Sequence, residues 1–196
     1  MSKFTEIIKK NLDDIIKPVA VLLAICIVIP LALSLTDKIT AKKIAALEAE
    51  NSKKNMSALV KADSFEKLSA GGTEYYAATL NGETAAYIFT ESAKGYGGDV
   101  SVMTAVKPDG TVAGVAVLDV SNETPGLGQN AAKESFFSQF AGLKKGVSLL
   151  KNGADHDNNE VDAVTGATVT STAVTRAVNG ALDNFEKIKG AAEDEE

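Results

Sequence analysis

Residues 73–120 have the sequence TEYYAATLNGETAAYIFTESAKGYGGDVSVMTAVKPDGTVAGVAVLDV. Runs rich in β-branched and aromatic residues alternate in this stretch with turn residues, and the runs cover 74–80, 84–90, 100–106 and 111–120. The separators are typical of tight connections between antiparallel strands: Asn81-Gly82, Gly95 to Gly98 and Pro108-Asp109-Gly110. The sequence therefore predicts an antiparallel meander.

Helical patterns flank this meander on both sides. Residues 38–61 combine apolar and charged residues without proline, and residues 131–143 surround Phe136, Phe137 and Phe140. Residues 171–189 place apolar side chains at helical spacing, so we expect an amphipathic helix that covers one face of the sheet. These patterns predict an α+β protein, an antiparallel sheet flanked by helices.

The most apolar part of the chain is residues 18–36, which carry no charge. At about 1.5 Å per residue, this segment is about 28 Å long as a helix, close to the thickness of the hydrocarbon core of a bilayer. We predict one transmembrane helix; the alternatives are a cleavable signal peptide and a buried core helix. Lysines both precede and follow the span, so the positive-inside rule does not decide its orientation.

The composition excludes several classes of function. The 196 residues have a net charge of −6, which gives no basic face for nucleic acid. One cysteine and one histidine, His156, cannot supply the ligands of an iron–sulfur cluster or a Cys/His zinc site. Any redox chemistry would therefore depend on an organic cofactor.

The segment Asp162 to Ser171, DAVTGATVTS, is the most informative for chemistry. Its small residues let a bulky ligand approach the backbone, and its hydroxyl groups offer hydrogen-bond donors or a point of attachment. The start of a helix also presents unpaired N–H groups that favour an anion. On these grounds alone, two interpretations remain open: a phosphate site, or a turn at Gly166 followed by a helix cap at Thr170 or Ser171.

This segment resembles the flavin-attachment element of a known family, the flavin-binding subunits of membrane redox pumps. Its members include the G subunit of the Rnf complex and the C subunit of the sodium-pumping NADH:quinone oxidoreductase. The element is D-x-x-(S/T)-G-A-T, which corresponds here to Asp162, Thr165, Gly166, Ala167 and Thr168. Two further segments match the family, the glycine-rich turn 94–98 and the loop 123–128, ETPGLG.

The resemblance implies that a flavin transferase joins FMN through its phosphate to Thr168, and that Asp162 belongs to the signature that this transferase recognises. It also implies contacts of the cofactor with residues of the attachment element, of the helix start and of the loop 123–128: Thr165, Gly166, Ala167, Thr170, Ser171, Glu123, Thr124 and Gly126. No metal site and no separate catalytic group is expected.

The length of the chain is similar to that of the Rnf G subunit. The resemblance thus implies a redox subunit, not catalytic alone, of an ion-translocating ferredoxin:NAD oxidoreductase. The implied partners are the other membrane subunits, especially the D subunit, and the flavin transferase during maturation. The alternatives are a C-type subunit of the quinone reductase and an anchored binding or scaffold domain without flavin.

The family also implies a topology for the chain, with the soluble domain outside the cytoplasm and the protein in the cytoplasmic membrane. The expected parts are a cytoplasmic N-terminus (1–17), a transmembrane helix (18–36), a helical stalk (37–62), an FMN-binding domain (63–190) and an acidic tail (191–196).

Overall fold

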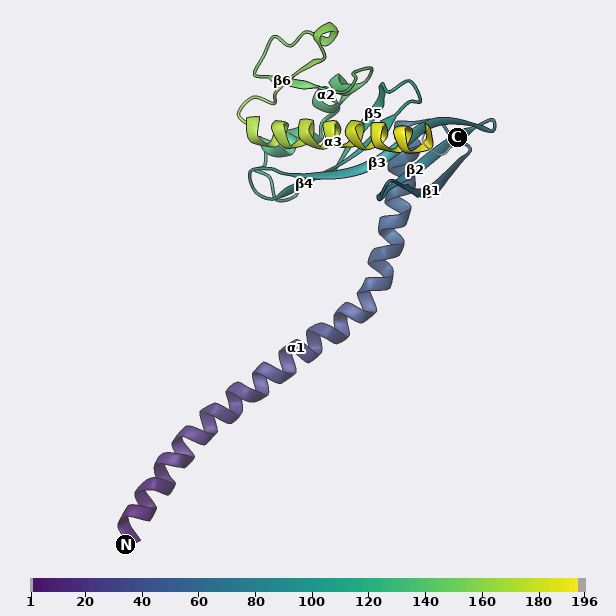
Figure 1. Cartoon of the computed structure of the whole chain (residues 1–196). Coiled ribbons are helices and arrows are strands. Elements are labelled where there is room, and N and C mark those ends of the chain that lie inside the picture. The colour runs from purple at the N-terminus through teal and green to yellow at the C-terminus, as the bar shows by residue number, and fades with distance from the viewer. Residues whose placement is uncertain (1, 194–196) are drawn as a thin grey trace. The chain divides into compact units, whose positions relative to one another are not determined.

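The computed structural model describes residues 2–193 of the chain (Figure 1). The chain divides into two compact units between Asn51 and Ser52. The first unit consists of most of one helix, α1 (Ser2–Leu59), and the end of the same helix belongs to the second unit. The stalk predicted at 38–61 is thus the continuation of the helix that contains the apolar run.

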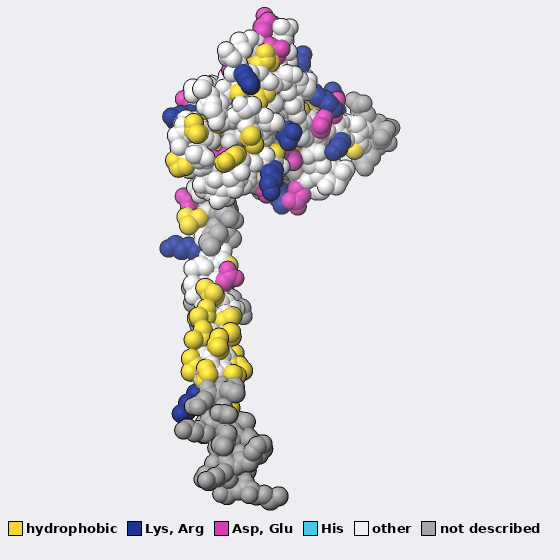
Figure 2. Space-filling view, turned by 90° about the vertical axis from the view of Figure 1, so that its left-hand side faces the viewer, with side chains coloured by type: hydrophobic (Ala, Val, Ile, Leu, Met, Phe, Trp, Pro, Cys, Tyr) yellow, Lys and Arg dark blue, Asp and Glu magenta, His cyan; other side chains and the backbone are white. Residues whose placement is uncertain are grey.

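The apolar part of α1 has the properties of a membrane span. Within residues 2–193, Ile16–Ser34 is the one stretch long and apolar enough to cross a bilayer, with a mean hydropathy of 2.6. Its side chains are exposed in the protein itself, and Figure 2 shows apolar groups gathered on the visible side of this part of the helix. This stretch begins and ends two residues before the predicted span. It contains Pro18 and Pro30, and the helix continues through both.

The second unit is built on a five-stranded antiparallel sheet in which each strand pairs with the next along the chain. The strands are β1 (Ser64–Ala70), β2 (Thr73–Leu80), β3 (Glu83–Lys94), β4 (Asp99–Val106) and β5 (Val112–Asp119). Four of them confirm the predicted meander. β1 was not predicted, because its sequence SFEKLSA is largely polar and lies at the edge of the sheet.

Both faces of the sheet are covered. The last helix, α3 (Thr168–Glu193), lies across one face of the sheet (Figure 1). Its Val174, Val178 and Leu182 belong to the same buried cluster as Phe89, Val102 and Val106 of the sheet. On the opposite face, Met56 near the end of α1 packs against Ala86, Ile88 and Met103. Because side chains alternate between the faces of a strand, β4 contributes to both clusters and is buried along almost its whole length.

The segment between β5 and α3 differs from the prediction. Residues 131–143 do not form one helix; the chain forms three short helical pieces, η1 (Gly128–Ala132), α2 (Glu134–Phe137) and η2 (Ser138–Phe140). Two short parallel strands follow, β6 (Ser148–Leu150) and β7 (Glu160–Asp162), with η3 (His156–Asn158) between them.

The final helix is longer than predicted. It begins at Thr168, three residues before the predicted start, and it continues to Glu193, so that residues 191–193 of the expected acidic tail are helical. Residues 194–196 lie outside the described part of the chain. The early start matters for the site, because it makes Thr168 the first residue of α3.

Candidate functional site

The segment before α3 forms a compact turn that fixes the position of Thr168. The Ala167 N–H donates to the Val164 carbonyl (2.9 Å), and the Ser171 hydroxyl accepts from the Val164 N–H (3.0 Å) and donates to the Ala167 carbonyl (3.0 Å). Gly166 has a φ of +77°, which glycine adopts without strain. The turn therefore belongs to the folded scaffold and presents Thr168 from a defined position.

Thr168 itself is exposed. The first N–H groups of a helix have no partner within that helix, and they carry a partial positive charge. A hydroxyl at the first position of a long helix therefore lies where an attached anionic group is stabilised. Thr170 and Ser171 lie inside the helix and are not its cap, so the interpretation of this segment as a simple helix cap at those residues is not confirmed.

Glu123 connects three segments that are distant in the sequence. Its side chain is only 3% exposed, and its carboxylate accepts from the Thr170 hydroxyl (2.5 Å) and from the Gly97 N–H (3.0 Å). The N–H groups of Tyr96 and Gly98 are close enough to favour the charged form of the carboxylate as well. One carboxylate thereby joins the turn between β3 and β4, the loop after β5 and the start of α3.

The pKa of Glu123 reflects this environment. Burial raises the pKa of the carboxyl, but the hydrogen bonds from Thr170 and Gly97, together with the nearby N–H groups of Tyr96 and Gly98, lower it by more, so the pKa lies below its ordinary value. Hydrogen bonds from N–H and O–H donors favour the charged form of a carboxyl group. Glu123 is therefore a carboxylate at neutral pH.

The packing around Glu123 leaves no room for a Cβ at Gly95, Gly97 or Gly128. A Cβ at Gly97 would overlap the carbonyl oxygen of Asn122, and a Cβ at Gly128 would lie 2.6 Å from Oε2 of Glu123. A side chain at Gly97 would force the backbone of Asn122 to move, and one at Gly128 would displace the buried side chains of Glu123 and Thr170. The glycines of the β3–β4 turn and of the loop after β5 therefore allow both segments to pack closely around the Glu123 carboxylate.

A cavity of about 590 Å³ opens between these segments. Its lining comes from the β3–β4 turn, the loop after β5 and the start of α3: Tyr96, Glu123, Thr124, Leu127, Gly128, Gly166, Ala167, Thr168, Val169 and Thr170. Three apolar side chains of this lining are well exposed, Tyr96 (76%), Val169 (51%) and Leu127 (44%). Figure 2 faces this end of the domain. The volume is typical of sites for small molecules and cofactors.

The structure brings six of the predicted site residues together at this cavity: Glu123, Thr124, Gly166, Ala167, Thr168 and Thr170. The other three predicted contact residues lie elsewhere. Ser171 is buried in the turn, Gly126 is not among the lining residues, and Thr165 borders two neighbouring cavities of about 380 and 440 Å³. Asp162 lines the first of these neighbours, and its carboxylate accepts from the Ala154 N–H (2.9 Å).

Four residues of the lining were not singled out from the sequence: Tyr96, Leu127, Gly128 and Val169. Each is part of, or next to, a motif that the sequence did reveal. In the sequence, each is only an apolar or glycine residue in or beside a loop motif. Such residues are equally typical of ordinary turns, so nothing marked these four as part of a binding site. His156, in contrast, is exposed on η3 and places its Nε2 atom 3.0 Å from the Ala141 carbonyl oxygen, away from this lining.

Comparisons with known proteins give consistent results. The FMN-binding domain family matches residues 95–183. The G subunit of the proton-translocating ferredoxin:NAD(+) oxidoreductase complex of Clostridium ljungdahlii is 36% identical over 166 residues, which cover 84% of this chain and 85% of that protein. The G subunit of the Na(+)-translocating complex of Acetobacterium woodii is 32% identical over 188 residues, which cover 86% of this chain and 90% of that protein.

Solved structures show the same fold. The crystal structure of NqrC from Shewanella oneidensis matches with a TM-score of 0.52 and 28% identity, over 56% of this chain and 55% of that chain. The C subunit of the Na(+)-translocating NADH-quinone reductase of Parabacteroides distasonis matches with a TM-score of 0.52 and 27% identity, over 59% of this chain and 61% of that chain. The match thus spans little more than half of each solved chain.

Proposed function

Because the chain belongs to the family of G subunits of ion-translocating ferredoxin:NAD(+) oxidoreductase complexes, we propose that it carries electrons in such a complex through FMN attached to Thr168. The observation that supports this most strongly is the position of Thr168. It is exposed, it is the first residue of a long helix, and it lines the cavity of about 590 Å³.

The residues of the cavity fit the chemistry of FMN. Leu127, Val169 and Tyr96 offer apolar surface for a flat ring system, and Thr168 offers a hydroxyl for the phosphate. The bond to Thr168 would make the FMN phosphate a phosphodiester with one negative charge, and the N-terminus of α3 would stabilise such a charge by about 0.3–1 kcal/mol. When bound, FMN supplies the ability to accept and release electrons, and the protein holds it in place and excludes water from part of its surface.

A G subunit fits the comparisons better than a C subunit of the quinone reductase. The relatives named as G subunits match over 84–86% of this chain and 85–90% of their own length. The solved C-subunit structures match over 55–61% of theirs. The chain therefore serves as a redox component of the ferredoxin:NAD oxidoreductase, and coupling of electron flow to ion transport is a property of the whole complex.

The apolar helix Ile16–Ser34 anchors the chain in the membrane beside its partners, the other subunits of the complex. Among these, the family resemblance favours the D subunit as a neighbour and a flavin transferase as the enzyme of maturation, with Asp162 in its recognition signature. It also favours residues 63–190 as the flavin-carrying domain on the extracytoplasmic side, with residues 1–17 in the cytoplasm. The covalent bond to Thr168 and the membrane helix together keep the cofactor at high effective concentration near its partners.

In-gel flavin fluorescence after denaturation tests the attachment. The wild type, expressed with the transferase, should give a fluorescent band, and Thr168→Val should give a dark one. Thr172→Val is a matched control, because its hydroxyl already donates to the Thr168 carbonyl (2.7 Å) one turn along the same helix, and it should keep its flavin. A dark wild-type band, or a fluorescent Thr168→Val band, would contradict the proposal.

A further inference from the structure

Tyr96 differs from the other tyrosines of the chain in its surroundings. Tyr75, Tyr87 and Phe185 lie in contact, with ring centroids 5.9 Å apart for Tyr75–Tyr87 and 5.4 Å apart for Tyr87–Phe185. Tyr76 packs with the cluster on the opposite face of the sheet. Within residues 2–193, Tyr96 has no such ring neighbour, and its side chain is 76% exposed. A large ring is therefore held at the surface without a partner in the fold.

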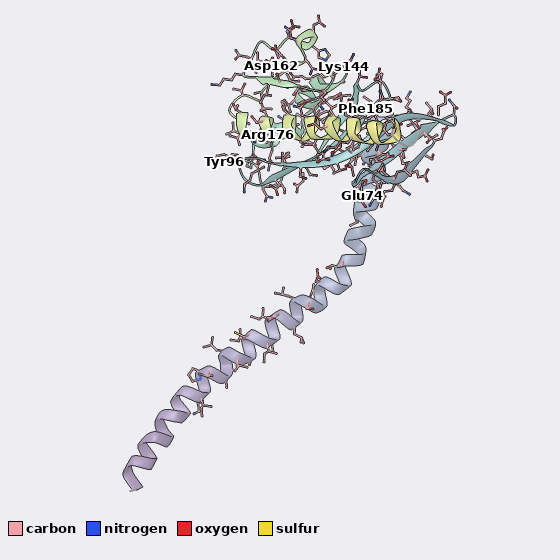
Figure 3. The ribbon with its side chains drawn as sticks, viewed as in Figure 1. Glu74, Tyr96, Lys144, Asp162, Arg176 and Phe185 are labelled. Atoms are coloured by element: carbon pink, nitrogen blue, oxygen red, sulfur yellow. The ribbon has the colours of Figure 1, made fainter. Side chains whose placement is uncertain are left out.

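The backbone that carries this ring is held firmly. The Gly95 N–H donates to the Gly98 carbonyl (2.7 Å), and the Gly97 N–H donates to the buried carboxylate of Glu123 (3.0 Å). A turn held by these two hydrogen bonds presents the Tyr96 side chain in a defined direction. Figure 3 shows Tyr96 at the end of the domain where α3 begins.

The ring borders the same cavity as Thr168, where it is joined by the exposed side chains of Leu127 and Val169. These three apolar residues come from three separate segments. Exposed apolar side chains that gather at one cavity mark a binding surface, whereas single ones need no explanation. The patch lies next to the attachment point of a group whose reactive part is a flat aromatic ring.

We propose that the phenol ring of Tyr96 stacks on the isoalloxazine ring of FMN held on Thr168, and that Tyr96 is a positioning residue for the flavin. This inference rests on the proposed function. Stacked aromatic rings attract each other beyond the burial of their surface, in offset or tilted arrangements. The fixed turn then lets Tyr96 restrict the orientation of a cofactor that its phosphoester alone would leave free to rotate.

The photophysics of flavin gives a direct test, since a tyrosine phenol in contact with an excited flavin quenches its fluorescence by reversible electron donation. The chain has no tryptophan and four tyrosines, and Tyr96 is the one tyrosine in the described lining of the cavity. Quenching of the native flavin should therefore depend on this residue. A phenylalanine ring packs similarly but does not donate an electron readily.

The experiment compares native and denatured flavin fluorescence of the full-length chain in detergent, for wild type, Tyr96→Leu, Tyr96→Phe and Tyr76→Phe. The wild type should be several-fold dimmer when native than when denatured, and both Tyr96 variants should lose most of that quenching. Tyr96→Phe should retain the native flavin absorption spectrum, because its ring still packs on the flavin. Tyr76→Phe, on the other side of the sheet, should behave as wild type.

The experiment distinguishes a failure of the Tyr96 stacking from a failure of the FMN attachment. If all chains carry flavin and the Tyr96 variants remain as dim as wild type, the stacking is wrong while the attachment stands. If the wild type carries no flavin, both the proposed function and the proposed stacking are wrong. Because Tyr96 is exposed, its replacement leaves the packed core intact, and circular dichroism of each variant verifies this.

Discussion

Replacement of Glu123 by alanine tests whether the site is held together as the structure indicates. The change removes the acceptor of the Thr170 hydroxyl (2.5 Å) and of the Gly97 N–H (3.0 Å) at a position that is 3% exposed. Hydrogen bonds to a charged group are worth about 1.5–3 kcal/mol each. Glu123 borders a cavity that water can enter, so we take the lower value, about 1.5 kcal/mol, for each of the two hydrogen bonds. Glu123→Ala should therefore lower the free energy of unfolding by about 3 kcal/mol.

For a protein of this size, 1 kcal/mol changes the melting temperature by about 2–4 °C, so Glu123→Ala should melt about 6–12 °C below wild type. The measurement is thermal unfolding of the full-length chain in detergent, followed by near-ultraviolet circular dichroism. Glu123→Gln is the matched control. Its carbonyl oxygen can accept from Gly97 and its amide can donate to Thr170, so its loss should be only about 1–2 kcal/mol.

The pH dependence gives an independent check. The pKa of Glu123 is lowered in the folded state by its hydrogen bonds, against the effect of burial. Its contribution to stability is therefore fully present above the ordinary carboxyl pKa and is lost as the pH falls through the lowered value. The difference in melting temperature between wild type and Glu123→Gln should shrink over that acidic range. A constant difference, or a Glu123→Ala variant within about 2 °C of wild type, would refute the reasoning.

Other predictions concern the surroundings of the site and the topology. Gly97→Ala should lose about 1–3 kcal/mol in the same assay, since its Cβ would collide with Asn122; wild-type stability would contradict the packing. Ser171→Ala should lose about 1–3 kcal/mol and lower the ratio of flavin to protein absorbance, because its hydroxyl holds the turn that presents the acceptor; unchanged flavin content would show that this turn is not needed. Asp183→Asn should change stability by less than about 1 kcal/mol, because its ion pair with Lys145 (2.7 Å) is at the surface; a larger loss would be inconsistent with solvent screening. Protease added to intact spheroplasts should digest the soluble domain, and protection of that domain would contradict its extracytoplasmic placement.

Local sequence signals predicted the central part of the fold because local chemistry determines it. Asn81 and Gly82 both have positive φ angles, 53° and 86°, the conformation that an Asn-Gly hairpin turn requires. The edge strand Ser64–Ala70 was not predicted, although Gly71 and Gly72 after it also have positive φ angles and form a turn. Its polar sequence does not show the alternation that a half-buried strand shows.

Elements that depend on distant partners could not be predicted in this way. The strands Ser148–Leu150 and Glu160–Asp162 are three residues each and exist through their parallel pairing with each other. The aromatic residues near Phe136 predicted one helix, and tertiary packing in the core divided it into three short pieces. Local propensity is a weak guide where tertiary contacts decide.

The site, like the fold, combines features that a local motif predicts with features that depend on contacts between distant segments. The motif before α3 predicts, through a family resemblance, that Thr168 is the acceptor, and Thr168 lies exposed at the cavity. We predict that Glu123 contacts the cofactor, and the structure shows its hydrogen bonds to Gly97, 26 residues earlier, and to Thr170, 47 residues later. Sequence separations of this size leave no periodic signal that a local pattern could reveal.

The central claim is that one threonine at the start of α3 carries the cofactor. Peptide mapping by mass spectrometry of the native, membrane-extracted chain measures this directly. The account predicts that the peptide containing Thr168 has gained the mass of FMN less one water, and that the same peptide of Thr168→Val has not. An unmodified Thr168 peptide from cells that contain the flavin transferase, or FMN found on another residue, would contradict the account.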